Sequence, residues 1–272
     1  RNNMFGVRLR SGIILVALAL LTIISGGYVL FGTLLAISLI GLGELYRAAQ
    51  IQKKDTKGLA VTGYLATFFY YGMLLLKLES YSTMLLIFIL VAFLFVYVFT
   101  FPKYHSEQVM GAFFGVVYVS VMLSYIYQTR NLPDGAYLVW LIFLCSWGCD
   151  TCAYCVGMLI GKHKMSPILS PKKSVEGAVG GVVGAALLGA IYAAVVGKYL
   201  QAENQVVMYA VICAVGALIS MVGDLAASAI KRNHEIKDYG TLIPGHGGIL
   251  DRFDSVIFTA PIIYFLASTF IK

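Results

Sequence analysis

Four aspartates stand out in a chain whose side chains are mostly apolar. Asp150 and Asp224 lie inside long hydrophobic runs, whereas Asp251 and Asp254 follow a glycine-rich turn near the C-terminus. An ionised carboxylate inside a membrane helix is costly unless it faces water, a cation or a polar partner. We therefore interpret Asp150 and Asp224 as site residues, with a hydrogen bond to a neighbouring helix as the simpler alternative. Asp251 and Asp254 are three residues apart and share one face if a helix has begun before them, as paired metal-binding carboxylates would.

Asp224 begins a row of polar side chains. With helical periodicity, Ser228 and Lys231 follow it on the same face, and Arg232 lies one step further round. An acid, a hydroxyl and a base in one row are not typical of a helix face that contacts lipid. We expect this row to face a polar site.

Two segments place cations and glycines close to these acids in the sequence. Segment 170–174 reads Ser-Pro-Lys-Lys-Ser and precedes a hydrophobic run, whose helix N-terminus would favour anions. Lys172 and Lys173 are therefore candidates for holding phosphates, although ordinary positive charge on the cytoplasmic side is an equal alternative. Segment 244–248 reads Pro-Gly-His-Gly-Gly, and its glycines allow backbone N–H groups to face an anion.

Together these residue types favour phosphate chemistry assisted by a hard cation. Carboxylate oxygens select ions such as Mg²⁺ rather than zinc. Mg²⁺, basic side chains and backbone N–H groups are the usual means of stabilising phosphoryl or nucleotidyl transfer. Because part of the set lies inside apolar runs and part outside them, we expect one lipid substrate and one soluble, phosphorylated substrate.

The apolar runs that carry these residues predict an all-α, polytopic integral membrane protein. Hydrophobic residues make up 60% of the chain and charged residues 12%, with a mean hydropathy of +0.84. Soluble domains have about 25% charged residues, and each run here approaches the length that crosses a hydrocarbon layer of roughly 30 Å. We predict about nine transmembrane helices, at 12–26, 28–45, 59–76, 80–101, 107–128, 135–160, 174–197, 205–230 and 253–271.

The chemistry is concentrated in the second half of the chain. Residues 1–134 form an N-terminal multi-span region in which Glu44 and Arg47 have the spacing of a helical ion pair. Residues 135–272 form the expected catalytic region, with cytoplasmic loops at 161–174 and 231–252.

The basic residues indicate the orientation in the membrane. With the N-terminus in the cytoplasm, all but four of the 20 Lys and Arg residues fall on the cytoplasmic side, which is a strong positive-inside bias. The exceptions are Lys77, Arg130, Lys198 and Lys272. We therefore attribute the net charge of +7 to topology and to anionic ligands or lipids, and expect no nucleic-acid partner.

Two further patterns have structural interpretations. Cys149, Cys152 and Cys155 are spaced like part of an iron–sulfur motif, but the fourth cysteine and the following proline are missing. On a straight helix the three would spread over too wide an arc to share one ion, so we interpret them as small apolar residues. The glycine-rich face of the run at 174–197 predicts close packing against another helix.

The combined motifs resemble the signature of the phosphatidate cytidylyltransferase (CDP-diacylglycerol synthase) family, with the similarity concentrated in residues 146–255. No charged signature position departs from the family pattern. The C-terminal part of the signature is Ser228-x-x-Lys231-Arg232, Lys237-Asp238 and Pro244-x-His246-Gly247-Gly248-x-x-Asp251-Arg252-x-Asp254. The upstream part is Asp150-x-x-Ala153-Tyr154 and Ser170-Pro171-Lys172-Lys173-Ser174-x-Glu176-Gly177.

The resemblance implies transfer of CMP from CTP to phosphatidic acid, which yields CDP-diacylglycerol and pyrophosphate in phospholipid biosynthesis. It implies a Mg²⁺-dependent nucleotidyltransferase, with a second cation as an option. The expected location is the bacterial cytoplasmic (inner) membrane, with the active site facing the cytoplasm. Whether the enzyme works as a monomer or a homodimer stays open.

The resemblance also implies roles for individual residues. The implied metal ligands are Asp150, Asp224, Asp251 and Asp254. The implied catalytic residues are Asp224, Lys231, Arg232, Asp251 and Asp254. Substrate contacts are implied for Ser170, Lys172, Lys173, Ser228, Lys237, His246, Gly247, Gly248 and Arg252. Among them, Lys172 and Lys173 would hold the CTP phosphates, Lys231 and Arg232 the phosphatidate head group, and His246 with the two glycines a pocket for pyrophosphate or the α-phosphate.

Three other classes of protein are alternatives. A CTP-dependent lipid or polyprenol kinase would transfer phosphate instead of CMP. A CDP-alcohol phosphatidyltransferase would share the lipid chemistry, but its Asp-Gly-x-x-Ala-Arg run is absent from this sequence. An ion-coupled transporter would use Asp150 and Asp224 as a midplane site, but the sequence has no apparent inverted repeat, and a transporter leaves the charged cytoplasmic loops unexplained.

Overall fold

The fold is described from a computed structural model of the chain. The described residues are all except 1, 53–56, 201–204, 246 and 272, and the side chains of residues 2–10 are also outside the description. The chain forms two compact units, and each is described by itself. The first unit comprises Arg1–Leu18, Gly27–Ser124 and His234–Arg252, and the second comprises Ala19–Gly26, Tyr125–Asn233 and Phe253–Lys272.

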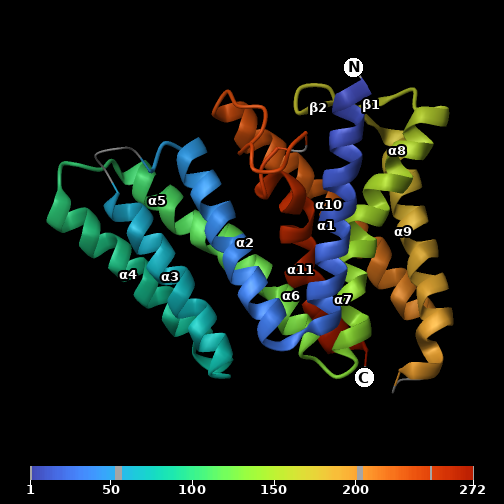
Figure 1. Ribbon diagram of the computed structural model, residues 1–272, viewed down its shortest axis with the longest axis horizontal. Coiled ribbons are helices and arrows are strands. Elements are labelled where there is room, and N and C mark those ends of the chain that lie inside the picture. Colours follow the sequence, from blue (N-terminus) through green and yellow to red (C-terminus); the bar gives the residue numbers. More distant parts are fainter. Residues whose placement is uncertain (1, 53–56, 201–204, 246, 272) are drawn as a thin grey trace. The chain divides into compact units, whose positions relative to one another are not determined.

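The first unit consists mainly of apolar helices from the N-terminal half of the chain. They are the first part of α1 (Asn2–Ser25), α2 (Gly27–Ala48), α3 (Gly58–Leu75), the 3₁₀ turn η1 (Glu79–Tyr81), α4 (Ser82–Thr100), α5 (Ser106–Gly115) and the π-helical segment η2 (Val116–Val121). Helices α2, α3, α4 and α5 pack against one another, as the blue and green ribbons of Figure 1 show.

Hydroxyl groups and glycines hold the helices of this unit together, because the hydrophobic effect provides little attraction between helices in lipid. The Tyr46 hydroxyl on α2 donates a hydrogen bond of 2.6 Å to the Ala112 carbonyl on α5. Thr67 on α3 and Ser120 on η2 share a buried hydrogen bond of 2.7 Å. A Cβ at Gly115 would lie 2.8 Å from the Tyr46 ring, so the glycine permits the close approach of α2.

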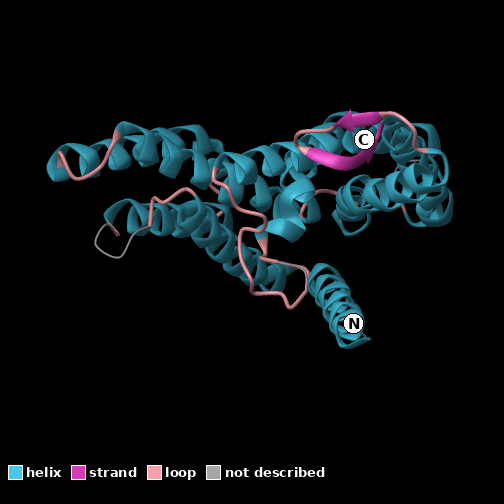
Figure 2. Cartoon of the chain, turned by 90° about the horizontal axis from the view of Figure 1, so that it is seen from above, coloured by secondary structure: helices cyan, strands magenta, loops and turns pink. Residues whose placement is uncertain are grey.

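The second unit contains the helices of the C-terminal half. They are most of α6 (Met122–Arg130), α7 (Gly135–Phe143), the π-helical segment η3 (Leu144–Gly148), α8 (Cys149–Ile160), α9 (Val175–Val196), the 3₁₀ turn η4 (Gly197–Tyr199), α10 (Val206–Asn233) and most of α11 (Leu250–Phe270). Between α8 and α9, strands β1 (Lys164–Ser166) and β2 (Ser170–Ser174) form an antiparallel hairpin. The strands are magenta in Figure 2, at the end of the helical unit.

Helix α9 packs on both α8 and α10 through a face of small residues. A Cβ at Gly177 would lie 2.7 Å from the Ala153 carbonyl oxygen of α8, so only glycine allows this separation of the two helices. The buried residues of the face are Gly177, Gly181, Ala185, Gly189 and Ala193. The other side of α9 exposes Val179, Val183, Leu187 and Ile191. The predicted close packing at the glycine-rich face is therefore confirmed.

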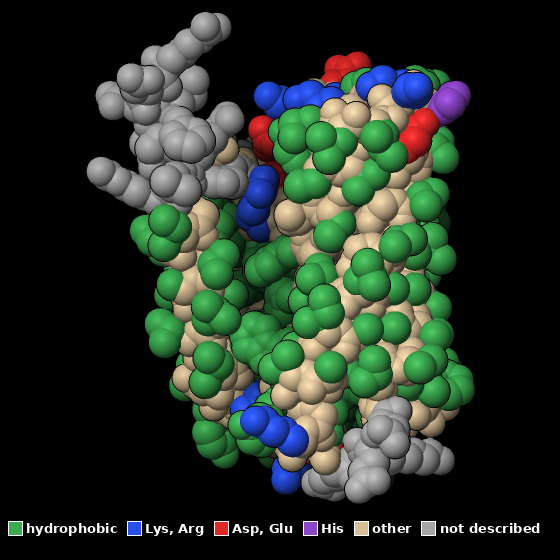
Figure 3. All heavy atoms as spheres, turned by 90° about the vertical axis from the view of Figure 1, so that its right-hand side faces the viewer, with side chains coloured by type: hydrophobic (Ala, Val, Ile, Leu, Met, Phe, Trp, Pro, Cys, Tyr) green, Lys and Arg blue, Asp and Glu red, His purple; other side chains and the backbone are tan. Residues whose placement is uncertain are grey.

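Eight helical segments in the described part of the chain are long and apolar enough to cross a membrane. They coincide with the last eight predicted spans, whereas the described apolar part of the first helix, Ser11–Ser25, is shorter. In Figure 3, hydrophobic side chains cover the long side of α8 and α9, and charged side chains gather at the two ends. The protein is thus a predominantly helical integral membrane protein.

Both predicted loops contain more regular structure than the sequence indicated. The hairpin occupies most of segment 161–174, where only a loop was expected. The loop at 231–252 is shorter than expected, because α10 continues through Asn233 and α11 begins at Leu250. Lys and Arg side chains favour the last turn of a helix, where the carbonyl groups carry partial negative charge. Lys231 and Arg232 accordingly lie in the last turn of α10, and Asp251 lies in the first turn of α11.

Candidate active site

An ion pair between Lys173 and Asp224 joins strand β2 to helix α10 in the second unit. The two side chains are 27% and 25% exposed, so solvent screens their charges only in part. Successive side chains of a strand point to opposite faces, and the neighbouring Lys172 is exposed. The fold thus brings together Lys173, which was predicted to bind phosphate, and Asp224, which was predicted to bind a metal ion.

Asp254 on α11 belongs to the same cluster of charges. Its carboxylate interacts electrostatically with the carboxylates of Asp224 and Asp150 and with the ammonium group of Lys231. Its Oδ1 accepts a hydrogen bond of 2.7 Å from the backbone N–H of Ser255. Because neighbouring carboxylates repel one another, a bound cation would stabilise the group. Three acids from α8, α10 and α11 therefore gather within the second unit.

The carboxylates of this cluster are of the type that binds Mg²⁺. Among the residues that the structure describes, no three His, Cys, Asp or Glu side chains converge as a ready set of metal ligands. Mg²⁺ does not require such a set, because it keeps several waters and binds through one or two carboxylates plus substrate phosphates. Asp224 and Asp254 lie close enough for their carboxylates to interact electrostatically. This pair of hard oxygen donors fits Mg²⁺ bound together with a phosphorylated substrate.

Helix α10 extends the cluster towards its C-terminal end. Since the helix is continuous from Val206 to Asn233, Ser228 and Lys231 lie on the same face as Asp224. All three side chains are half-buried, whereas Arg232 is exposed. The row predicted from helical periodicity is therefore present in the fold.

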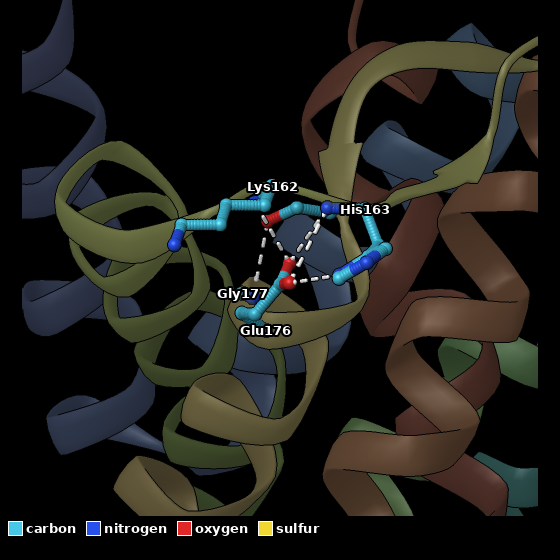
Figure 4. A network of polar contacts seen from close by, with 5 residues as sticks. Lys162, His163, Glu176 and Gly177 are labelled. Atoms are coloured by element: carbon cyan, nitrogen blue, oxygen red, sulfur yellow. Dashed lines mark hydrogen bonds and ion pairs between the residues drawn. The ribbon is translucent and has the colours of Figure 1, made fainter.

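The hairpin that carries Lys173 is anchored at the beginning of α9. The Ser174 hydroxyl caps this helix by accepting a hydrogen bond of 3.1 Å from the Gly177 N–H. The Glu176 carboxylate accepts hydrogen bonds from the backbone N–H groups of Lys162 at 3.1 Å and His163 at 3.2 Å. The His163 Nδ1 lies 2.6 Å from the same carboxylate (Figure 4). These contacts fasten both ends of the hairpin to one helix terminus.

In the first unit, the glycine-rich segment closes on Asp251, whose side chain is buried. The Asp251 Oδ2 accepts hydrogen bonds from the backbone N–H groups of Tyr239 at 2.8 Å and Gly248 at 2.9 Å. Gly247 has a φ of 85°, a conformation that favours glycine. We expected the glycine N–H groups to face a substrate anion. The N–H of Gly248 instead binds Asp251, because this carboxylate lies within hydrogen-bonding distance on the first turn of α11.

Glu44 on α2 is a buried carboxylate whose partners are distant in the sequence. Its Oε1 accepts a hydrogen bond of 3.0 Å from the Ile249 N–H, and its Oε2 accepts one of 2.9 Å from the Leu250 N–H. Arg47, the expected ion-pair partner, interacts with Glu44 only through longer-range electrostatics. The buried role of Glu44 could have been suspected from the sequence, because Glu44, like Asp150, is an acid within an apolar run.

The other predicted substrate contacts lie near chain turns and helix ends. Lys172, Lys237 and Arg252 are exposed, and Ser170 is half-buried. His246 lies outside the described residues. Their contacts with a substrate remain predictions.

The cysteines of α8 serve helix packing. A Cβ at Gly181 would lie 2.9 Å from the Cys149 Sγ, and a Cβ at Gly184 would lie 2.5 Å from the Cys152 Sγ. Cys149 is buried, Cys152 is half-buried and Cys155 is exposed, so the three sulfur atoms point in different directions around the helix. Their contacts support the interpretation as small apolar residues.

Sequence comparison relates the chain to a known family. A model of the cytidylyltransferase family matches residues 6–270, which is nearly the whole chain. The chain belongs to the cytidylyltransferase family. Membership confirms the resemblance inferred from the motifs in residues 146–255.

Similar members of the cytidylyltransferase family carry the name phosphatidate cytidylyltransferase. The protein of Staphylococcus saprophyticus is 36% identical over 151 residues, which are 56% of this chain and 56% of that protein. The Bacillus subtilis protein is 36% identical over 156 residues, or 57% and 56% of the two chains. The Synechocystis protein is 40% identical over 137 residues, or 50% and 45%. The chain thus spans about half the length of the curated relatives it matches.

Proposed function

We propose that this cytidylyltransferase transfers CMP from CTP to phosphatidic acid and releases pyrophosphate. The observation that carries the proposal is the cluster of Lys173, Asp224 and Asp254 on apolar helices and the adjoining hairpin. The cluster combines a fixed cation with hard oxygen donors, which suits the triphosphate of a nucleotide. The names of the bacterial relatives support phosphatidic acid as the acceptor.

The reaction requires no nucleophilic side chain from the protein. The phosphate monoester of phosphatidic acid is largely ionised at pH 7, because its second pKa is about 6. One of its oxygens attacks the α-phosphorus of CTP and forms a new P–O bond. The bond between the α-phosphorus and the oxygen that bridges to the β-phosphorus breaks, and pyrophosphate leaves with that electron pair. The main barrier is the approach of two anions, which fixed positive charges lower.

In this proposal, Lys173 and Lys172 bind the CTP phosphates from the hairpin. Asp224 holds the Lys173 ammonium group in place before the nucleotide arrives, so that less reorganisation is needed on binding. Lys231 and Arg232, in the last turn of α10, bind the phosphate of phosphatidic acid. Glu176 and Ser174 keep the strand of Lys173 fixed to α9 through the hydrogen bonds described above.

We also propose that Asp224 and Asp254 hold Mg²⁺, and that Asp150 is a further ligand or organises a second cation. When bound, Mg²⁺ neutralises charge on the phosphate groups and orients them for in-line displacement. Asp251, the fourth predicted ligand, lies in the first unit. Its Oδ2 already accepts two backbone hydrogen bonds, and its role as a ligand remains a prediction.

The proposed location is the bacterial cytoplasmic membrane, with the N-terminus and the active site facing the cytoplasm. The support is the positive-inside distribution of Lys and Arg and the bacterial origin of the relatives. The Lys173–Asp224 pair and the neighbouring Asp254 come from a single chain.

The direct test is an assay of CMP transfer with purified protein. The protein is incubated with α-labelled CTP, phosphatidic acid and Mg²⁺, and the lipid phase is extracted. We expect label in CDP-diacylglycerol, release of pyrophosphate, and loss of both when Mg²⁺ is removed with a chelator. Absence of label from the lipid, with protein whose cooperative thermal unfolding shows that it is folded, would overturn the proposed function.

A further inference from the structure

Glu44 is a carboxylate with a defined role in a half of the chain where the sequence analysis found little chemistry. The residue is 2% exposed, and both of its oxygens accept hydrogen bonds from backbone N–H groups at the start of α11. Burial of an unpartnered charge is strongly unfavourable. The first N–H groups of a helix lack partners within the helix and carry partial positive charge. The hydrogen bonds therefore give partners both to the buried Glu44 carboxylate and to the N–H groups at the start of α11.

Two glycines, Gly240 and Gly248, also lie directly against the Glu44 carboxylate. A Cβ at Gly240 would lie 2.5 Å from the Glu44 Oε1, and a Cβ at Gly248 would lie 2.5 Å from Oε2. A carboxylate that is held by two hydrogen bonds cannot move away without losing them. Both positions consequently require glycine, and their main-chain atoms are confined by α2.

Asp251 holds some of the same residues through hydrogen bonds. Its Oδ2 binds the N–H groups of Tyr239 and Gly248. Gly248 is therefore held by Asp251 through its N–H and confined by Glu44 at its Cα. We call this arrangement the carboxylate clasp; it consists of Glu44 and Asp251 with Tyr239, Gly240, Gly248, Ile249 and Leu250. All of its members belong to the first unit.

We propose that Glu44 is a positioning residue for CMP transfer, acting through the carboxylate clasp. By binding the Ile249 and Leu250 N–H groups, Glu44 sets the conformation of the glycine-rich segment and the first turn of α11. The inference rests on the proposed function, in which Asp254, one turn after Leu250 on the same helix α11, is a ligand of Mg²⁺. Small displacements of a preorganised site reduce turnover more than they reduce ground-state binding.

The test compares Glu44→Gln and Glu44→Ala with two control variants. In Glu44→Gln, one oxygen remains as an acceptor, but the amide NH₂ group faces a backbone N–H, whereas Glu44→Ala removes both acceptors. Glu107→Gln makes the same chemical change at an exposed position of the first unit. Ser38→Ala on α2 removes a buried hydrogen bond of 2.8 Å to Tyr71 on α3, and so weakens the packing of α2 without removing a contact of the clasp.

Two measurements are made on the full-length protein in detergent or nanodiscs. The first is amide hydrogen exchange at Tyr239, Gly248, Ile249 and Leu250. The second is the kcat and the KM for CTP in the labelled-lipid assay. We expect faster exchange at these amides and a kcat lower by about 10- to 100-fold, with a much smaller change in KM. Glu44→Ala is expected to have the larger effect and Glu44→Gln the smaller. Both control variants are expected to retain wild-type exchange at these amides and wild-type kcat.

Three results would overturn the proposal. Unchanged exchange at the four amides in Glu44→Gln would show that Glu44 does not hold the segment. Faster exchange with wild-type kcat would show that the clasp does not serve the reaction. An equal loss of kcat in Ser38→Ala would assign the effect to weakening of α2. If the wild-type protein transfers no CMP, the proposed function fails, while the exchange experiment still decides whether Glu44 holds the segment.

Discussion

Lys173 on strand β2 forms an ion pair with Asp224 on helix α10, 51 residues later in the chain. While the ion pair is formed, the charge of each side chain is occupied by the other. The carboxylate of Asp224 holds the Lys173 ammonium group in place, and it also repels the carboxylate of Asp254. In the proposed function, the oxygens of a bound triphosphate would replace Asp224 as partners of Lys173. Asp224 would then be free to hold a cation, which would neutralise charge on the phosphates.

Substitution of Lys173 should reduce activity more than substitution of its neighbour. Lys173→Met keeps the length of the side chain but removes the charge, and we expect kcat/KM for CTP to fall by about 100-fold, as for loss of one preorganised group. Lys172→Met makes the same change on the other, exposed face of β2, where solvent screens the charge. Its loss should be clearly smaller in the same steady-state assay. An equal or larger loss in Lys172→Met would contradict the assignment of Lys173.

Asp254→Asn should remove activity while leaving the fold intact. The amide keeps the size of the side chain but no longer offers a charged oxygen to a cation, so we expect CMP transfer to fall by about 100-fold or more. The remaining activity should require a higher Mg²⁺ concentration. Asp134→Asn, at the N-terminal cap of α7 in the same unit, is the matched control and should keep wild-type activity. Normal activity in Asp254→Asn would exclude Asp254 from the metal site.

The packing of α9 on α8 predicts opposite effects of one substitution at two glycines. Gly177→Ala places a Cβ 2.7 Å from the Ala153 carbonyl oxygen, and overpacking of this kind costs about 1–3 kcal/mol. Gly72→Ala in α3 meets no atom within 4 Å and should be neutral or stabilising, because alanine favours a helix over glycine by about 1 kcal/mol. Thermal unfolding in detergent measures both. Equal stability of the two variants would contradict the close contact between α8 and α9.

Much of the site depends on local patterns, and those features were predictable from the sequence. The face shared by Asp224, Ser228 and Lys231 follows from helical periodicity alone. The apolar runs likewise identify the spans, because the bilayer imposes their length. The shared helix of Asp251 and Asp254 was expected only if the last helix begins before Asp251, and α11 begins at Leu250.

The tertiary partners of the acids could not be predicted in this way. Glu44 and Ile249 are separated by 205 residues, and helical spacing suggested Arg47 as the partner instead. The use of the Gly248 N–H by Asp251 depends on where α11 begins, and the sequence pattern did not locate that residue. The hairpin at 164–174 was missed because its strands are short and rich in charged residues and proline, which are uncommon in strands.

The position of the transferred label tests the central claim most directly. Two parallel reactions contain the purified protein, phosphatidic acid and Mg²⁺, one with CTP labelled at the α-phosphate and the other with CTP labelled at the γ-phosphate. The account predicts label in the lipid only from the α position, with one pyrophosphate released for each lipid labelled. Label in the lipid from the γ position would identify a lipid kinase and would contradict the assignment of CMP transfer.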